Sequence, residues 1–544
     1  MLTIFSMLFF MTYTFILYMF FLSFFQKSFM VEFFLFNYQN IDVSLSIVFD
    51  FVSLGFFCCV SFITFTVFLY SIFYMEGNSD LRRFSLMVFL FVASMFILVF
   101  SSNFFMTMIG WDGLGLVSFC LVVFYSNSTS LESGLVTVFS NRVGDVFFLV
   151  SFLYMYLNKM FSWDFFSYSI SYLFIIFLFL GAITKSAQIP FSAWLPAAMA
   201  APTPVSSLVH SSTLVTAGVY MLIRFNYLFN FLNFSMMKIT FLMTMLVAGF
   251  CAVMENDLKK IVAMSTLSQL GMMMFILSVG LWSLSFIHMI IHAFFKSMLF
   301  LSTGSLMGQM EGVQDSRFYG NSFFSYASLI FFMTSCLSLS GFPFFIGFYS
   351  KDQIISSNSF YSGLFYYYLF LMGCIFTVMY SIRLVYEAYL KSYKYFNMMK
   401  QEESKYFFVP VMLLFFKCWL IGGMFYWFFL ISMNFFISFM DLFVGIFLLT
   451  LGLLLNIFLK ISYRNYFMLS SIIFMRWKSS GGSSFYMSKM SNFSQYEFTW
   501  MEILGSGGLF KSIEFKNVIM SYMINMKLGI LMMLIIYMLM IYFL

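Results

Sequence analysis

The sequence predicts an all-α polytopic membrane protein with about 15 transmembrane helices. Of the 544 residues, 62% are hydrophobic and only 9% are charged. A soluble protein carries about 25% charged residues to cover its surface, so this composition, with a mean hydropathy of +0.96, indicates lipid as the solvent. Apolar runs of spanning length, separated by polar breaks, also recur along the chain.

The composition excludes several other classes of protein. A net charge of +6 is spread too thinly for a nucleic-acid-binding surface, and in a bilayer protein Lys and Arg mostly set loop orientation. The seven cysteines include no CxxC, so we expect small apolar packing residues rather than a metal or iron–sulfur site.

The apolar runs define the expected helices. The first run has spanning length and no small-residue cleavage site, which predicts a first helix rather than a cleaved signal peptide. The expected spans lie near 4–25, 43–73, 84–101, 103–126, 131–157, 171–199, 204–224, 235–254, 259–281, 283–308, 322–356, 360–388, 408–431, 436–460 and 526–544.

Two of these runs are interrupted by prolines and are predicted to be broken helices. The run 171–199 contains Pro190 and Pro196, and the run 322–356 contains Pro343. A proline frees a backbone carbonyl, which protein or water must satisfy inside a membrane. Broken helices at corresponding positions of two halves indicate an inverted-repeat transporter, and ordinary proline kinks are the alternative.

Counting helices predicts two inverted five-helix repeats, each with its broken helix fourth. Residues 461–525 are too polar to span, and part of them is predicted to form an amphipathic helix along the membrane face or a partner. The expected organisation is 1–83, N-terminal transmembrane helices; 84–224, first repeat; 235–388, second repeat; 400–460, additional transmembrane helices; 461–525, polar linker and lateral helix; and 526–544, C-terminal transmembrane anchor.

Charged residues inside the expected spans are the candidate functional residues, because each costs at least about 2.5–3.5 kcal/mol at the bilayer centre. Arg142 and Asp145 are three residues apart and therefore able to pair, either as a structural salt bridge or in support of proton transfer. Lys259, Lys260 and Arg383 are candidates too, with interfacial snorkelling as the alternative. The remaining candidates outside helix 283–308 are Asp112, Lys185, His210, Lys351 and Asp352.

His288, His292 and Lys296 are spaced four apart and fall on one stripe of a helix. A lone membrane histidine usually indicates an interhelical hydrogen bond, but three titratable groups on one stripe favour a proton path. Zinc is the competing interpretation of His-x3-His, although the glutamate of HExxH is absent.

Buried lysines suit proton transfer because burial favours the neutral amine and a nearby carboxylate favours the charged form. If Asp112 approaches Lys185, the lysine holds its proton, and if Asp112 moves away, the lysine releases it. Arginine does not release its proton at working pH. We therefore predict a set of buried groups that titrate together.

Several segments resemble the antiporter-like membrane subunits of respiratory complex I. The resemblance covers about residues 45–390. Its motifs are Gly110-Trp-Asp-Gly-Leu-Gly-Leu, Asn141-Arg-Val-Gly-Asp145, the stretch from Lys185-Ser-Ala-Gln-Ile-Pro to Val-His210, Asp257-Leu-Lys-Lys-Ile, Ser265-Thr-Leu-Ser-Gln, His292-Ala-Phe-Phe-Lys296 and Gly347-Phe-Tyr-Ser-Lys-Asp352.

The resemblance implies two proton half-channels joined by a charged axis at mid-membrane. Lys185 and Lys351 match the lysines of the two halves, and His210 matches the first-half histidine. Asp112 stands where many members have glutamate, one methylene longer, which changes its reach toward Lys185. The connecting relay matches Lys259, His288, His292 and Lys296.

The resemblance also implies a multi-pass subunit of the mitochondrial inner membrane that translocates protons as part of NADH:ubiquinone reductase. Its partners would be other complex I subunits, especially neighbouring antiporter-like ones, and membrane lipids, with no nucleic acid. No cofactor is expected on this chain, since it has no GxGxxG after a strand and no cysteine cluster. NADH, FMN, iron–sulfur clusters and ubiquinone are expected on partner subunits.

Two alternative functions stand beside this one. The first is a stand-alone cation/proton antiporter subunit of the same superfamily, against which the long C-terminal lateral segment argues. The second is an assembly or structural membrane protein, against which the series of buried charges from Asp112 to Lys351 argues.

Overall fold

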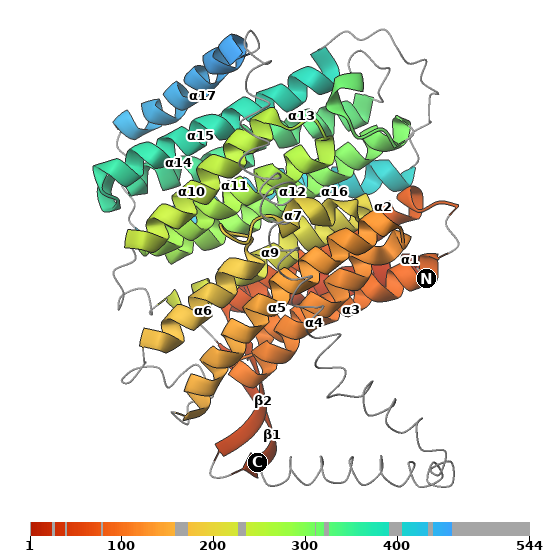
Figure 1. The fold of residues 1–544 in the computed structure, drawn as a ribbon, viewed down its shortest axis with the longest axis vertical. Coiled ribbons are helices and arrows are strands. Elements are labelled where there is room, and N and C mark those ends of the chain that lie inside the picture. Colours follow the sequence, from red (N-terminus) through yellow and green to blue (C-terminus); the bar gives the residue numbers. More distant parts are fainter. Residues whose placement is uncertain are drawn as a thin grey trace, which may run out of the picture. The chain divides into compact units, whose positions relative to one another are not determined.

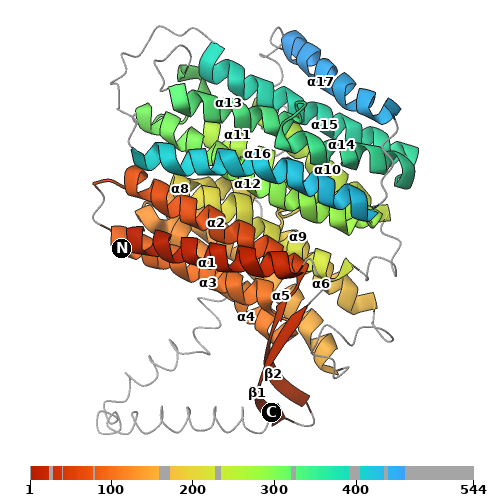
Figure 2. The ribbon, with the colours of Figure 1, turned by 180° about the vertical axis from the view of Figure 1, so that it is seen from behind.

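The computed structural model describes residues 2–23, 28–38, 41–77, 80–157, 172–226, 235–310, 312–319, 326–390, 405–433 and 439–459. These residues all lie within one compact unit of the chain. They form a bundle of long helices lying side by side, with one β-hairpin (Figures 1 and 2). The predicted lateral helix and the anchor 526–544 lie outside the described residues.

The long helices follow the apolar runs, because a backbone in lipid must satisfy its own hydrogen bonds. They are α1 (Leu2–Ser23), α2 (Phe51–Tyr74), α3 (Leu81–Phe100), α4 (Phe104–Val122), α5 (Ser128–Leu157), α6 (Tyr172–Lys185), α9 (Leu214–Arg224), α10 (Ser235–Met254), α11 (Leu258–Val279), α12 (Trp282–Gln309), α13 (Tyr326–Ser340), α14 (Ile346–Tyr361), α15 (Leu364–Val385), α16 (Lys405–Met433) and α17 (Phe439–Leu459).

Short helical segments join some of these helices. They are η1 (Val123–Tyr125), α7 (Trp194–Ala197), η3 (Ala198–Ala200), α8 (Thr203–Val205), η4 (Ser206–Thr213), η6 (Ser316–Phe318) and η7 (Tyr386–Leu390). The segments η4 and η7 are π-helical. Such segments are rare in proteins overall, and those that occur are often found at functional sites.

Within the described residues, ten helices are long and apolar enough to cross a membrane, and four shorter apolar helices accompany them. The chain is therefore a multi-pass membrane protein that is mostly helical. The count of about fifteen spans and the inverted relation of the two repeats stay predictions.

A β-hairpin corrects the all-α expectation. Strands β1 (Phe29–Tyr38) and β2 (Ile41–Phe49) pair antiparallel, so the predicted helix 43–73 begins only at Phe51. The reason lies in the stretch from Val43 to Ile47, where apolar residues alternate with serines at the period of a strand.

The hairpin is tied to the helices at its base. Asn103, at the start of α4, donates from Nδ2 to the carbonyl oxygen of Ser44 at 2.5 Å. The amide of Ser102 donates to the carbonyl of Ser46 at 3.2 Å. Asp50, between β2 and α2, forms an ion pair with Arg224 at 2.6 Å.

Both predicted breaks are present. Helix α6 ends at Lys185, and the chain turns before it resumes as α7. Helix α13 ends at Ser340, and α14 starts at Ile346. Each break holds a residue other than glycine in the left-handed region, Ala187 at φ 54° and Phe344 at φ 69°, a conformation that persists only when the surrounding structure holds it.

Candidate functional site: buried lysines at two broken helices

Lys185 is the last residue of α6 and is fully buried. Its Nζ donates to the carbonyl oxygen of Trp111 on α4 at 2.5 Å and lies 3.9 Å from the centroid of the same indole ring. The C-terminal end of a helix carries partial negative charge, which also favours the ammonium. The break therefore leaves a buried lysine with a main-chain acceptor and an aromatic face.

The carboxylates of Asp145 and Asp112 lie near Lys185 without a direct hydrogen bond to it. Asp145 on α5 is buried, and its Oδ2 lies 3.3 Å from Nη1 of Arg142, which is 45% exposed. Asp145 and Asp112 both lie within electrostatic range of the Lys185 ammonium. Oδ1 of Asp112 has no hydrogen-bond partner among the described residues. The acceptor of Lys185 is thus a carbonyl next to Asp112 and not the Asp112 side chain.

Close contact between α5 and α6 brings Asp145 near Lys185. Gly144 precedes Asp145, and a Cβ on Gly144 would meet Oγ1 of Thr184 at 1.9 Å. Thr184 in turn precedes Lys185. Glycine allows this approach, because a Cβ at residue 144 would overlap the side chain of Thr184.

Lys351 on α14 repeats this arrangement at the second break. Its Nζ donates to the carbonyl oxygen of Leu339 at 2.5 Å and to Oγ1 of Thr377 at 3.1 Å. Leu339 lies in the last turn of α13, where helix carbonyls lack an intrahelical partner. The helix break thus supplies the acceptor that holds the lysine.

The histidine stripe lies on α12 as predicted, fully buried. His288 Nδ1 is 2.9 Å from Oγ of Ser350, and Nε2 is 3.2 Å from Oε1 of Gln269 on α11. Both ring nitrogens of His292 lack a hydrogen-bond partner among the described residues, and the two imidazole centroids are 6.4 Å apart. Within those residues no three His, Cys, Asp or Glu side chains converge as metal ligands.

Lys296, one turn beyond His292, is also fully buried and donates to Oγ of Ser265 on α11 at 2.5 Å. It lies within electrostatic range of Lys351, as does His288. Asp352 is buried beside Lys351, and its Oδ2 has no hydrogen-bond partner among the described residues. Its Oδ1 faces α17, 2.7 Å from where a Cβ on Gly445 would lie.

His210 lies in the π-helical segment η4 and is buried, with its ring 6.3 Å from that of Trp194 in an edge arrangement. Neither of its ring nitrogens has a hydrogen-bond partner among the described residues. Lys259, in the first turn of α11, is buried and donates to the carbonyl of Ala201 at 3.4 Å.

Burial differs among the residues with a snorkelling alternative. Lys260 is 43% exposed and pairs with Asp257, and for this residue the alternative stays open. Arg383 is only 2% exposed, so for this residue the snorkelling interpretation is wrong: packing of α15 on α10 buries it. Near this end of α10, burial raises the pKa of the Glu255 carboxyl outside the spans.

Two groups of predicted residues come together. The first consists of Asp112, Arg142, Asp145 and Lys185, and the second consists of His288, His292, Lys296, Lys351 and Asp352. His210 and Lys259 are buried, but neither makes a described hydrogen bond to a member of these groups.

The quoted motifs contain Ser265, Gln269 and Ser350, but sequence reasoning gave no role to these polar residues that bond to the titratable ones. Gln269 contacts His288 and the hydroxyl of Tyr380. A glutamine inside an apolar span could have indicated a buried hydrogen-bond partner. Lys417 was also overlooked, although it interrupts an apolar run; its ammonium donates to Tyr13 and lies 5.5 Å from the ring of Phe62.

Residues 101–377 match the family described as NADH:quinone oxidoreductase/Mrp antiporter, TM. Residues 35–85 match the family described as NADH-Ubiquinone oxidoreductase (complex I), chain 5 N-terminus. Both groups of site residues lie in the first of these regions.

Named relatives are NADH-ubiquinone oxidoreductase chain 5 proteins. The Anopheles gambiae protein is 46% identical over 65% of this chain and 63% of its own length. The Locusta migratoria protein is 44% identical over 69% of this chain and 67% of its own length. The Lumbricus terrestris protein is 41% identical over 71% of this chain and 68% of its own length. The match therefore spans about two thirds of each relative.

Two solved structures share the fold. A chain of the Mrp complex from a Dietzia species superposes with a TM-score of 0.70 at 22% identity, covering 93% of this chain and 57% of that one. A chain of the archaeal membrane-bound sulfane sulfur reductase superposes with a TM-score of 0.68 at 17% identity. This match covers 78% of this chain and 91% of that one.

Proposed function

We propose a function from the premise that the chain belongs to the NADH-ubiquinone oxidoreductase chain 5 family. We infer that it is a proton-translocating membrane-arm subunit of respiratory complex I in the mitochondrial inner membrane. NADH oxidation and ubiquinone reduction would take place on partner subunits, which would hold NADH, FMN, iron–sulfur clusters and ubiquinone. The partners in direct contact would be neighbouring antiporter-like subunits, braced by the predicted lateral helix.

The observation that carries this proposal is a buried lysine at each helix break, held by a backbone carbonyl. Lys351 has two acceptors, Leu339 and Thr377. An ammonium has three N–H donors and a neutral amine has two. Lys351 can therefore lose one proton while both hydrogen bonds remain, and burial favours the neutral form that results.

The proposed path runs from Lys351 into α12. Ser350, its neighbour in the chain, lies within hydrogen-bond distance of Nδ1 of His288. The opposite ring nitrogen faces Gln269, so the imidazole bridges α14 and α11. His292 and Lys296 continue the stripe in steps of one helical turn. We propose this series as the second half of the relay, with Asp352 biasing the charge on Lys351.

The first half centres on Lys185. Asp145 and Asp112 lie within electrostatic range of Lys185, and Arg142 pairs with Asp145. A small movement of α5 against α6 would change the distance from Asp145 to Lys185 and hence the tendency of Lys185 to hold its proton. His210 and Lys259 would complete the axis between the halves, and the two halves would be related as inverted repeats.

The test is proton pumping per NADH oxidised by reconstituted complex that carries Lys351→Met, with assembly checked on native gels. We expect both pumping and turnover to fall while assembly stays normal. Lys260→Met is the matched control, because this half-exposed lysine pairs with Asp257 outside the proposed path. Parental pumping by assembled Lys351→Met complex would show that Lys351 is only structural and would refute the relay.

A further inference from the structure

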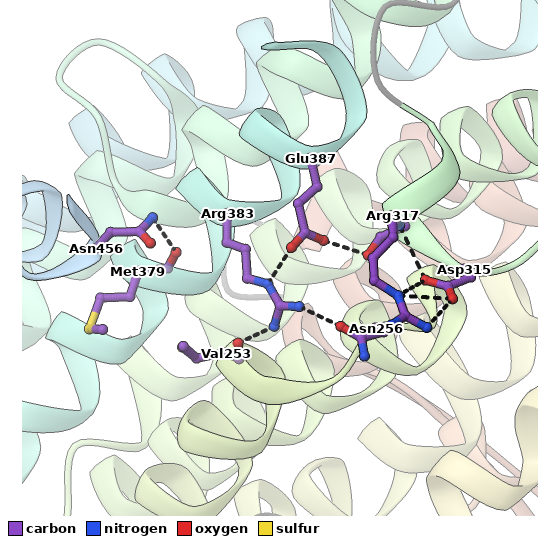
Figure 3. A network of polar contacts seen from close by, with 9 residues as sticks. Val253, Asn256, Asp315, Arg317, Met379, Arg383, Glu387 and Asn456 are labelled. Atoms are coloured by element: carbon purple, nitrogen blue, oxygen red, sulfur yellow. Dashed lines mark hydrogen bonds and ion pairs between the residues drawn. The ribbon is translucent and has the colours of Figure 1, made fainter. Parts of the chain in front are cut away.

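A buried ion pair at the end of α15 takes no part in the proposed relay. Arg383 and Glu387 are 2% and 7% exposed, and Nε of Arg383 lies 2.9 Å from Oε1 of Glu387 (Figure 3). Taking two charges out of water costs free energy that their attraction alone often fails to recover. The other contacts of these two side chains therefore matter for why the pair is buried.

The guanidinium contacts the connection between α10 and α11. Nη1 of Arg383 donates to the carbonyl of Val253 in the last turn of α10, and Nη2 donates to Oδ1 of Asn256 at 3.0 Å. A planar guanidinium reaches a carboxylate, a helix carbonyl and an amide oxygen at once, which a single ammonium cannot do in the same directions.

Glu387 contacts the segment that follows α12. Its Oε2 accepts a hydrogen bond from Oγ of Ser316 at 2.5 Å. The backbones of the two contacted segments also pair: the Ser316 amide donates to the Asn256 carbonyl at 2.8 Å, and the Leu258 amide donates to the Gln314 carbonyl at 2.9 Å. We call Arg383, Glu387, Asn256 and Ser316 the α15 clamp.

We propose that Arg383 and Glu387 are positioning residues that set the place of the Lys259 ammonium by fixing the first turn of α11. Lys259 comes three residues after Asn256, and its contact with the Ala201 carbonyl is long, at 3.4 Å. A long contact alone holds the ammonium loosely, so its position depends on where α11 begins. This inference rests on the proposed proton relay and adds two residues that act through Lys259.

The test combines substitutions in the assembled complex. Arg383→Met with Glu387→Met removes both charges together, so neither is left buried and unpaired. We expect this double variant to assemble and to pump fewer protons per NADH, down to the level of Lys259→Met. Adding Lys259→Met to the double variant should cause no further loss, because the clamp acts through that lysine. Additive losses would overturn the proposal.

Two further variants separate positioning from mere support of the fold. Arg383→Lys keeps the positive charge beside Glu387 but loses the planar guanidinium that reaches three acceptors at once. We therefore expect pumping between the parental and double-variant levels. Arg317→Met removes a charge from the same segment, 57% exposed and outside the clamp, and should pump normally. Normal pumping by assembled double variant would refute the clamp. Normal pumping by Lys259→Met would instead refute the place of Lys259 in the relay.

Discussion

At the scale of single residues, the site is built from lysines whose hydrogen-bond partners are neutral. Lys185 and Lys351 each donate to a backbone carbonyl, and Lys296 donates to a serine hydroxyl. A neutral acceptor stabilises an ammonium less than a carboxylate does, and the proposed relay depends on this difference. Carboxylates act at longer range, as Asp145 does on Lys185.

This arrangement makes a prediction for Lys185. Lys185→Arg keeps a cation beside Trp111 but cannot release a proton at working pH. We expect the arginine variant to pump as poorly as Lys185→Met, measured as protons moved per NADH oxidised by assembled complex. If Lys185→Arg pumped at the parental level, Lys185 would be a fixed structural cation and the titration account would be wrong.

At the scale of elements, contacts that only glycine permits bring the helices of each site together. Gly144 faces Thr184 where α5 meets α6, and a Cβ on Gly347 would lie 1.8 Å from the Ser338 carbonyl where α13 meets α14. Both contacts lie within a few residues of a relay lysine. The geometry of the breaks therefore depends on packing as well as on proline.

We expect Gly144→Ala to destabilise the α5–α6 contact by about 1–3 kcal/mol, as overpacking of a tight core does. The measurement is the rate of thermal inactivation of pumping in membranes. Adding Thr184→Ala removes the clashing hydroxyl and should restore part of the stability. Gly115→Ala is the control, because nothing lies within 4 Å of its Cβ position. Equal effects of both alanines would contradict the close-approach account.

At the scale of the whole described bundle, a polar junction connects the hairpin to three helices. Asp50 at the start of α2 pairs with Arg224 at the end of α9, whose Nε donates to the Tyr220 hydroxyl at 2.9 Å. That hydroxyl donates to the carbonyl of Val99 on α3 at 2.7 Å. The hairpin (Figure 2) is thus fixed to the bundle at its base.

Arg224→Met should loosen this junction, since hydrogen bonds to charged groups are worth about 1.5–3 kcal/mol. We expect faster limited proteolysis within residues 29–49 in membrane vesicles. Asp315 and Arg317 form a more exposed pair, so Arg317→Met should change the rate little, in line with the 0–1 kcal/mol or so that surface pairs contribute. Unchanged cleavage in Arg224→Met would show that strand pairing and the contacts of Ser102 and Asn103 hold the hairpin without Arg224.

The sequence by itself determined the membrane class, the two helix breaks and most of the titratable residues of the candidate site. Those features are local: hydropathy, prolines and charges inside apolar runs can be read without knowing what packs against what. The four-residue spacing likewise placed His288, His292 and Lys296 on one stripe of α12, as the structure confirms.

Tertiary structure alone decided the hairpin and the partners of the charged groups. Residues 43–49 are apolar enough to be read as part of a membrane span. They form a strand because their alternating apolar and serine residues can pair with β1 through backbone hydrogen bonds. Lys185 bonds to Trp111 rather than to Asp112, and Arg383 is buried rather than exposed, because helices distant in sequence pack there. Long-range contacts choose among acceptors that local spacing leaves equivalent.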